Sequence, residues 1–134
     1  TDWQKLLGRD RFAMGDPAHV PAGIYAKQAL QVTNIWQSLR GNAVFGENIR
    51  LSLRLVERGD VGAAILYKSD AELTENVAII HEFDGSSHDP IIYPMVLLQS
   101  DNHPAKQFFD YLKRAPATAV FRRFGFTALE DQDG

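Results

Sequence analysis

The chain has 134 residues, which is enough for one domain with a workable hydrophobic core. Apolar residues make up 45% of it and charged residues 23%, and no run approaches the roughly 18 apolar residues that a membrane-spanning helix needs. A net charge of −3 and a pI near 5.7 argue against nucleic-acid binding, and the lack of cysteine excludes disulfide bonds and thiolate chemistry.

The first half of the chain alternates short apolar runs with amphipathic stretches, a pattern that indicates an α/β fold. The elements expected there are a helical turn over 3–7 capped by Asp2, a strand at 11–14, a helix from Pro21 to about Val32, a turn at 36–39, a strand at 43–45 and a helix from about 48 to Arg58. In the last helix the apolar residues Ile49, Leu53 and Val56 recur at i, i+4 and i+7, and Gly59 suits the position just past its end.

The second half has three apolar runs and two helical patterns. The run 61–67 predicts a strand buried on both faces, and the runs 77–83 and 91–98 predict two more strands. Residues 84–90 form the clearest linker. The phenylalanine-rich helices that follow, over about 105–112 and 116–124, need a sheet to bury against, and one strand after the linker supplies little of it.

The loop 15–26 is the most informative segment of the chain. Pro21 suits the first position of the helix that follows, where its missing N–H costs nothing. We expect the amides of Ala22 and Gly23 to be unpaired at the positive end of the helix dipole, and the missing Cβ of Gly23 to allow a ligand close to the backbone. This pattern predicts an anion site built from backbone groups, although a Pro-Gly loop is more often only a loop.

Two other positions extend this predicted site. A second helix start near Asn48 leaves the amide of Ile49 available, and Tyr67 lies at the end of a predicted strand, where sheets of this class place ligands. For Tyr67 the residues alone favour a half-buried packing role at the end of the sheet over ligand binding. Two helix N-termini and a hydroxyl supply hydrogen-bond donors, which suits an oxyanion that carries no proton. Asp16 and His19 are expected to stabilise the loop rather than bind metal, and no hydrolase triad is expected at 86–89.

The run GDPAHVPAGIYAKQAL at 15–30 resembles the periplasmic molybdate-binding proteins of molybdate ABC transporters. The likeness continues through ENIR at 47–50, LVERG at 55–59, ILYKSDA at 65–71, YP at 93–94 and FGFT at 124–127, and so covers nearly the whole chain. It implies a type II periplasmic-binding-protein-like α/β lobe, with a mixed sheet flanked by helices, over residues 1–90. Residues 91–134 would be a crossover strand and helices that complete the other, first lobe.

The same resemblance implies that Ala22, Ile49 and Tyr67 bind the oxyanion, without direct ligands to a metal ion. Ile49 replaces a residue that is usually valine, a change that leaves the backbone donor in place. The implied function is capture of molybdate or tungstate for delivery to a membrane permease in the periplasm, with no enzymatic activity and no cofactor. Selection against sulfate would depend on the size of the cavity.

The first lobe of that family begins with a strand and two serine-bearing loops that this sequence lacks, so we expect the C-terminal part of a longer protein carrying half a site. The expected partners are the missing lobe or a second copy of the chain, as in a domain-swapped oligomer, besides the oxyanion and the permease. The competing hypothesis is a ligand-sensing or interaction module of the same fold that binds another oxyanion such as sulfate. The basic residues Arg50, Arg54 and Arg58 are expected on a solvated helix face, with contact to the permease as the alternative.

Overall fold

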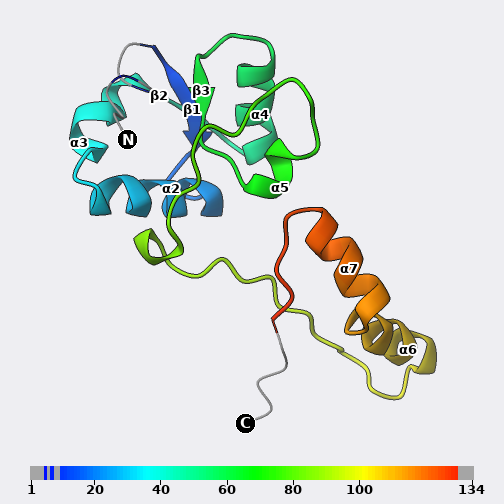
Figure 1. Ribbon diagram of the computed structural model, residues 1–134. Helices are drawn as coiled ribbons and strands as arrows, with labels where there is room; N and C mark the ends of the chain where they lie inside the picture. Colours follow the sequence, from blue (N-terminus) through cyan, green and yellow to red (C-terminus); the bar gives the residue numbers. More distant parts are fainter. Residues whose placement is uncertain (1–4, 6, 8–9, 130–134) are drawn as a thin grey trace. The chain divides into compact units, whose positions relative to one another are not determined.

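The computed structural model describes Lys5, Leu7 and residues 10–129 (Figure 1). The chain divides into two compact units, Thr1–Pro90 and Ile91–Gly134. The helical turn predicted over 3–7, with its cap at Asp2, lies mostly outside the described residues. Within the described part, no helix is long and apolar enough to cross a membrane.

Unit 1 is built on a three-stranded parallel sheet of order β2-β1-β3. Strand β1 (Phe12–Gly15) is central and buried at every position, β2 (Ala43–Gly46) pairs along its full length, and β3 (Ala63–Ala64) pairs with its first two residues. The predicted α/β class is confirmed. The expected mixed sheet is, in the described residues, purely parallel, because the later apolar runs that would have added strands do not pair.

The helices are α2 (Pro21–Val32), α3 (Trp36–Leu39), η1 (Arg40–Asn42), α4 (Ile49–Glu57), α5 (Lys68–Ala71), η2 (Gly85–Ser87), α6 (His103–Leu112) and α7 (Ala115–Arg123). The predicted helices in the described residues lie close to their expected positions, and η1, α5 and η2 are short helices that the sequence did not predict. Local chemistry sets the helix ends: Asn48 and Asn102 cap α4 and α6 with their side chains. Gly59 and Gly125 take positive φ angles of 73° and 83° just after α4 and α7.

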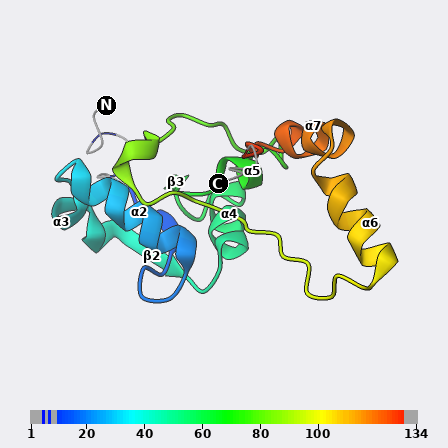
Figure 2. The same cartoon turned by 90° about the horizontal axis from the view of Figure 1, so that it is seen from below.

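The core of unit 1 lies where α2 and α3 pack against β1. Buried apolar side chains from these three elements, together with Leu7 and Ala63, form one cluster: Leu7, Phe12, Met14, Ala26, Leu30, Trp36, Leu39 and Ala63. Helix α4 contacts β1 from the other face, and Figures 1 and 2 show α2 and α4 on opposite sides of the strands. Because the chain runs from β1 to one neighbour and then crosses to the other, right-handed connections require these helices to lie on opposite faces.

Three strand predictions need correction. The run 61–67 forms only the two-residue β3, although Ile65 still donates its N–H to the Ala13 carbonyl at 2.9 Å. The runs 77–83 and 91–98 are not strands, and several of their apolar side chains are exposed. An apolar run becomes a strand only when a sheet edge can satisfy its backbone, and the described residues offer these two runs no such edge.

Unit 2 consists of α6 and α7 with the extended segments before and after them. Tyr93 and Phe126 meet edge to face, with ring centroids 5.7 Å apart. Large apolar side chains on or beside the two helices are exposed in the chain as described: Phe108, Tyr111, Val120, Phe121, Phe124 and Phe126. The phenylalanine-rich helices form as predicted, and the described residues of unit 2 form no strand that could cover them.

Ser52, in α4, allows a test of how the buried face of that helix packs. Its side chain is fully buried, its Oγ atom has no hydrogen-bond partner among the described residues, and Gly46 packs against it. We predict that Ser52→Ala leaves the free energy of unfolding unchanged or raises it by about 1 kcal/mol, because it removes an unsatisfied buried hydroxyl. Ser38→Ala is the control, since the exposed Ser38 hydroxyl donates to the Ile35 carbonyl at 2.9 Å. Denaturant unfolding measures both, and a clear loss of stability in Ser52→Ala would contradict the prediction.

Candidate functional site

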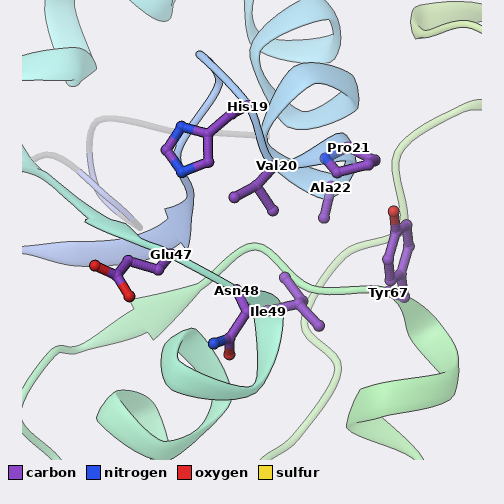
Figure 3. Close-up of a pocket in the computed structure, with 8 residues that line it drawn as sticks. All are labelled: His19, Val20, Pro21, Ala22, Glu47, Asn48, Ile49 and Tyr67. Atoms are coloured by element: carbon purple, nitrogen blue, oxygen red, sulfur yellow. The ribbon is translucent and has the colours of Figure 1, made fainter.

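A pocket of about 310 Å³ lies beyond the carboxyl ends of the three strands (Figure 3). Three loops supply its walls, and the lining residues are His19, Val20, Pro21, Ala22, Glu47, Asn48, Ile49 and Tyr67. The carboxyl ends of parallel strands share one edge, and the loops diverge where successive helices pass to opposite faces. The topology therefore brings together Ala22, Ile49 and Tyr67, the three residues singled out from the sequence.

The first turn of α2 presents one unpaired amide to this pocket. Gly23 donates its N–H to the Val20 carbonyl at 2.9 Å, as does Ile24 at 3.1 Å. The N–H of Ala22 has no acceptor among the described residues, and Val20 provides no side-chain cap. The expectation of two unpaired amides is therefore wrong for Gly23, because the tight first turn uses its N–H internally.

Gly23 is needed for packing and not for ligand approach. A Cβ atom there would overlap the carbonyl group of Gly15 and lie 2.8 Å from the carbonyl carbon of Asp16. A Cβ on Gly15 would in turn lie 3.0 Å from the Gly23 nitrogen. The two glycines let the start of α2 rest directly on the end of β1, and this contact places Ala22.

The loop between β1 and α2 is braced by Asp16. Its carboxylate accepts the Ala18 N–H at 2.8 Å, its carbonyl accepts the Val20 N–H at 2.8 Å, and its own N–H donates to the Gly46 carbonyl at 2.9 Å. His19 Nδ1 lies 3.9 Å from the Asp16 carboxylate. The prediction that Asp16 stabilises the loop with His19 beside it is confirmed.

Helix α4 offers the second backbone donor. Asn48 caps it by accepting the Leu51 N–H at 3.0 Å, which leaves the Ile49 N–H without an acceptor among the described residues. In Figure 3 the Ile49 side chain lies between α4 and the Tyr67 ring, while the Asn48 side chain turns back toward its own helix. The cap could be predicted from an asparagine standing just before an apolar, helix-periodic run.

Tyr67 comes from the segment after β3 and precedes α5. Its carbonyl accepts the N–H groups of Asp70 and Ala71 at 3.1 and 3.2 Å, so its backbone begins that helix. Figure 3 shows its phenol oxygen directed toward Pro21 and Ala22. The neighbouring Lys68 forms an ion pair with Glu82 at 2.7 Å, and this hydrogen bond raises the pKa of the Lys68 ammonium.

The pocket lining carries no lysine or arginine. Its one carboxylate, Glu47, points away from Tyr67 in Figure 3, and the described residues contain no cluster of His, Cys, Asp and Glu able to hold a metal ion. Of the basic residues on α4, Arg58 pairs with Asp60 at 3.3 Å. Burial raises the pKa of the Asp70 carboxyl, and the charge of Arg50 opposes this shift in part. The groups that this lining could offer to an anion are therefore backbone N–H groups and a hydroxyl.

Residues 1–127 match the model of a family described as bacterial extracellular solute-binding protein. The chain belongs to this family. It is 42% identical over 128 residues to the molybdate-binding protein ModA of Escherichia coli K12, covering 95% of this chain and 50% of that protein. It is 36% identical over 130 residues to the Bacillus subtilis putative ABC transporter substrate-binding lipoprotein YvgL, covering 96% of this chain and 50% of that protein.

Among solved structures, the substrate-binding domain of a putative molybdenum ABC transporter from Clostridium difficile matches with a TM-score of 0.77 and 27% identity, covering 90% of this chain and 53% of that one. The solute-binding chain thus spans about half the length of the relatives it matches. The resemblance identified from the sequence is confirmed. The sensing-module hypothesis is not favoured, because these relatives carry the names of binding and transport proteins.

The contact between the two glycines gives a direct test of how α2 is placed. We predict that Gly23→Ala lowers the free energy of unfolding by about 1–3 kcal/mol, because backbone atoms cannot move aside as a flexible side chain does. Gly41→Ala is the matched control, since a Cβ there meets nothing within 4 Å. Denaturant unfolding of the two variants compares them, and equal stabilities would count against the packing role of Gly23.

Proposed function

We propose that this solute-binding chain binds molybdate or tungstate through the N–H groups of Ala22 and Ile49 and the hydroxyl of Tyr67. The observation that carries the proposal is that three loops bring these donors to one pocket whose lining has no lysine or arginine. Two of the relatives compared above bear molybdate or molybdenum in their names, which supports this choice of ligand. Molybdate would be the carried ligand and not a cofactor.

The donor set suits a fully deprotonated dianion. Backbone N–H groups at helix starts can only donate, and each lies at the positive end of a helix dipole. Each hydrogen bond to a charged group contributes about 1.5–3 kcal/mol, and the dipoles add roughly 0.3–1 kcal/mol each. An oxyanion that still carried a proton would find no acceptor on the two amides and only the Tyr67 hydroxyl oxygen to accept it.

We further propose that this chain supplies half of the ligand shell. Residues 1–90 would be one lobe of a longer receptor, and 91–134 would cross to complete the other lobe, whose loops would supply the remaining donors. The exposed apolar side chains of α6 and α7 and the unpaired run 91–98 support this assignment. A sheet in the rest of the receptor would cover those helices and pair with that run.

In this proposal the complete receptor works in the periplasm, passes its oxyanion to the permease of an ABC transporter, and catalyses no reaction. Selection between molybdate and sulfate would follow from cavity size, because both are tetrahedral dianions and the donors are common to both.

Calorimetry on the complete two-lobed receptor tests the ligand. We expect molybdate to bind and sulfate to bind much more weakly. Tyr67→Phe should weaken molybdate binding about 10- to 100-fold, since it removes one hydrogen bond to a charged group. Tyr111→Phe in α6 is the control for loss of a phenol hydroxyl elsewhere. Absence of molybdate binding, or equal binding of sulfate, would refute the proposal.

The chain of 134 residues by itself should bind molybdate several orders of magnitude more weakly than the complete receptor. The reason is that two or three hydrogen bonds of about 1.5–3 kcal/mol each would be missing. Titration of both proteins with molybdate measures the difference, and equal affinities would show that the half-site assignment is wrong.

The same chain, separated from any other lobe, should self-associate through its exposed apolar residues on α6 and α7. Light scattering over a range of concentrations measures this. Phe108→Ser combined with Phe121→Ser should reduce the association, because both rings are exposed on these helices. A clean monomer at high concentration would contradict the prediction.

A further inference from the structure

The segment through which the chain leaves unit 1 is fastened to helix α2. Gln28 Nε2 donates to the Asp89 carboxylate at 2.7 Å, and the Asp89 backbone N–H donates back to Gln28 Oε1 at 3.0 Å. The two residues lie 61 positions apart in the sequence. One amide side chain therefore fastens both the backbone and the side chain of Asp89.

The fastened segment also has internal bracing. The Asp84 carbonyl accepts both the N–H and the hydroxyl of Ser87, at 2.9 and 2.6 Å, and the Asp84 carboxylate accepts the Ser86 N–H at 2.8 Å. Ser87 is buried, and the ring of His88 lies 5.9 Å from that of Tyr25 on α2. Figures 1 and 2 show η2 beside α2. The predicted linker 84–90 is thus, up to Asp89, an ordered part of unit 1.

Helix α2 joins this segment to the candidate site. Ala22 lies in its first turn, and Gln28 follows six residues later, about 9 Å along the helix axis. After Asp89 comes Pro90, whose ring restricts φ, and unit 2 begins at the next residue. Helix α2 therefore carries the proposed ligand donor Ala22 in its first turn and, at Gln28, holds the segment through which the chain leaves unit 1.

We propose that Gln28 and Asp89 form a latch that makes segment 84–89 part of the same rigid body as α2, so that a displacement of unit 2 reaches the Ala22 amide. The ligand part of this inference rests on the proposed function. Gln28 and Asp89 do not line the pocket and act as positioning residues. Suppose that the other half of the ligand shell lies beyond Pro90. Without the latch, the exit segment would then have to become ordered each time ligand binds, and the entropy lost in that ordering would weaken the affinity.

The chemistry of the latch permits a rescue design. Gln28→Glu is nearly isosteric, but it replaces the Nε2 donor with a carboxylate oxygen against the Asp89 carboxylate, so the pair repels. Adding Asp89→Asn restores the pairing, because the new carboxylate accepts from the asparagine amide and still accepts the backbone N–H. Asp89→Asn alone keeps an acceptor for Gln28. Gln31→Glu, at an exposed position on the same helix, controls for the added charge.

Hydrogen exchange of the amides in 85–89, measured by mass spectrometry on the 134-residue chain without ligand, tests the latch directly. Gln28→Glu should speed exchange about tenfold, while the double variant, Asp89→Asn and Gln31→Glu stay near the parent rate. Unchanged exchange in Gln28→Glu would overturn the latch. Fast exchange that persists in the double variant would overturn it as well.

Molybdate dissociation from the complete receptor tests the link to the site. Gln28→Glu should raise the dissociation rate about tenfold with little change in the association rate, and the double variant should reverse this. Faster exchange with an unchanged dissociation rate would refute the transmission to Ala22. If the parent receptor does not bind molybdate, the proposed function fails and the link to ligand release fails with it, while the exchange experiment still decides the latch.

Discussion

The close contact between the end of β1 and the start of α2 is the constraint on which the candidate site depends. Gly15 and Gly23 leave no room for a Cβ atom, so the backbone of the helix start rests on the backbone of the strand end. That contact sets where the Ala22 amide points. Asp16 then fixes the intervening loop, and its N–H donates to the carbonyl of Gly46 at the end of β2, so one backbone hydrogen bond joins two of the three pocket loops.

A site made of backbone donors has consequences for how it recognises a ligand. The amides of Ala22 and Ile49 keep their donor character in almost any residue, so the side chains at these positions remain available to shape the cavity. The lining has no lysine or arginine, so in the proposed function an anion would be held by oriented dipoles, whose positions the fold determines in advance. Rigid placement of α2 and α4 therefore matters more here than net charge, which is negative for the whole chain.

Several features could be read from local patterns. The bounds of α2, α3 and α7, the Asn48 position before α4 and the positive-φ glycines after α4 and α7 follow from residue preferences that act over a few positions. Ala22, Ile49 and Tyr67 were singled out by helix-start chemistry together with family likeness, and the parallel topology brings them to one pocket. Their role as ligand donors remains a proposal.

Other features depended on partners distant in sequence. The runs 77–83 and 91–98 have strand-like composition, but a strand also needs a sheet edge, which composition does not report. The sequence around Gly23 is the same whether the space beside it is taken by a ligand or by another backbone segment. Only the folded chain shows that the backbone of Gly15 lies there. Residues 84–89 contain the polar residues of a linker, and the pairing with Gln28 becomes visible only when α2 is in place.

The sequence by itself thus determined the α/β class, most helix ends and the loop chemistry of an anion site, because capping, periodicity and proline or glycine constraints are local. The tertiary structure alone decided which amides remain unpaired, why two glycines face each other, and that the exit segment belongs to unit 1. Gln28 and Asp89 lie 61 positions apart, and Gly15 and Gly23, although close in sequence, meet only when α2 packs on β1, so local preferences do not encode these contacts.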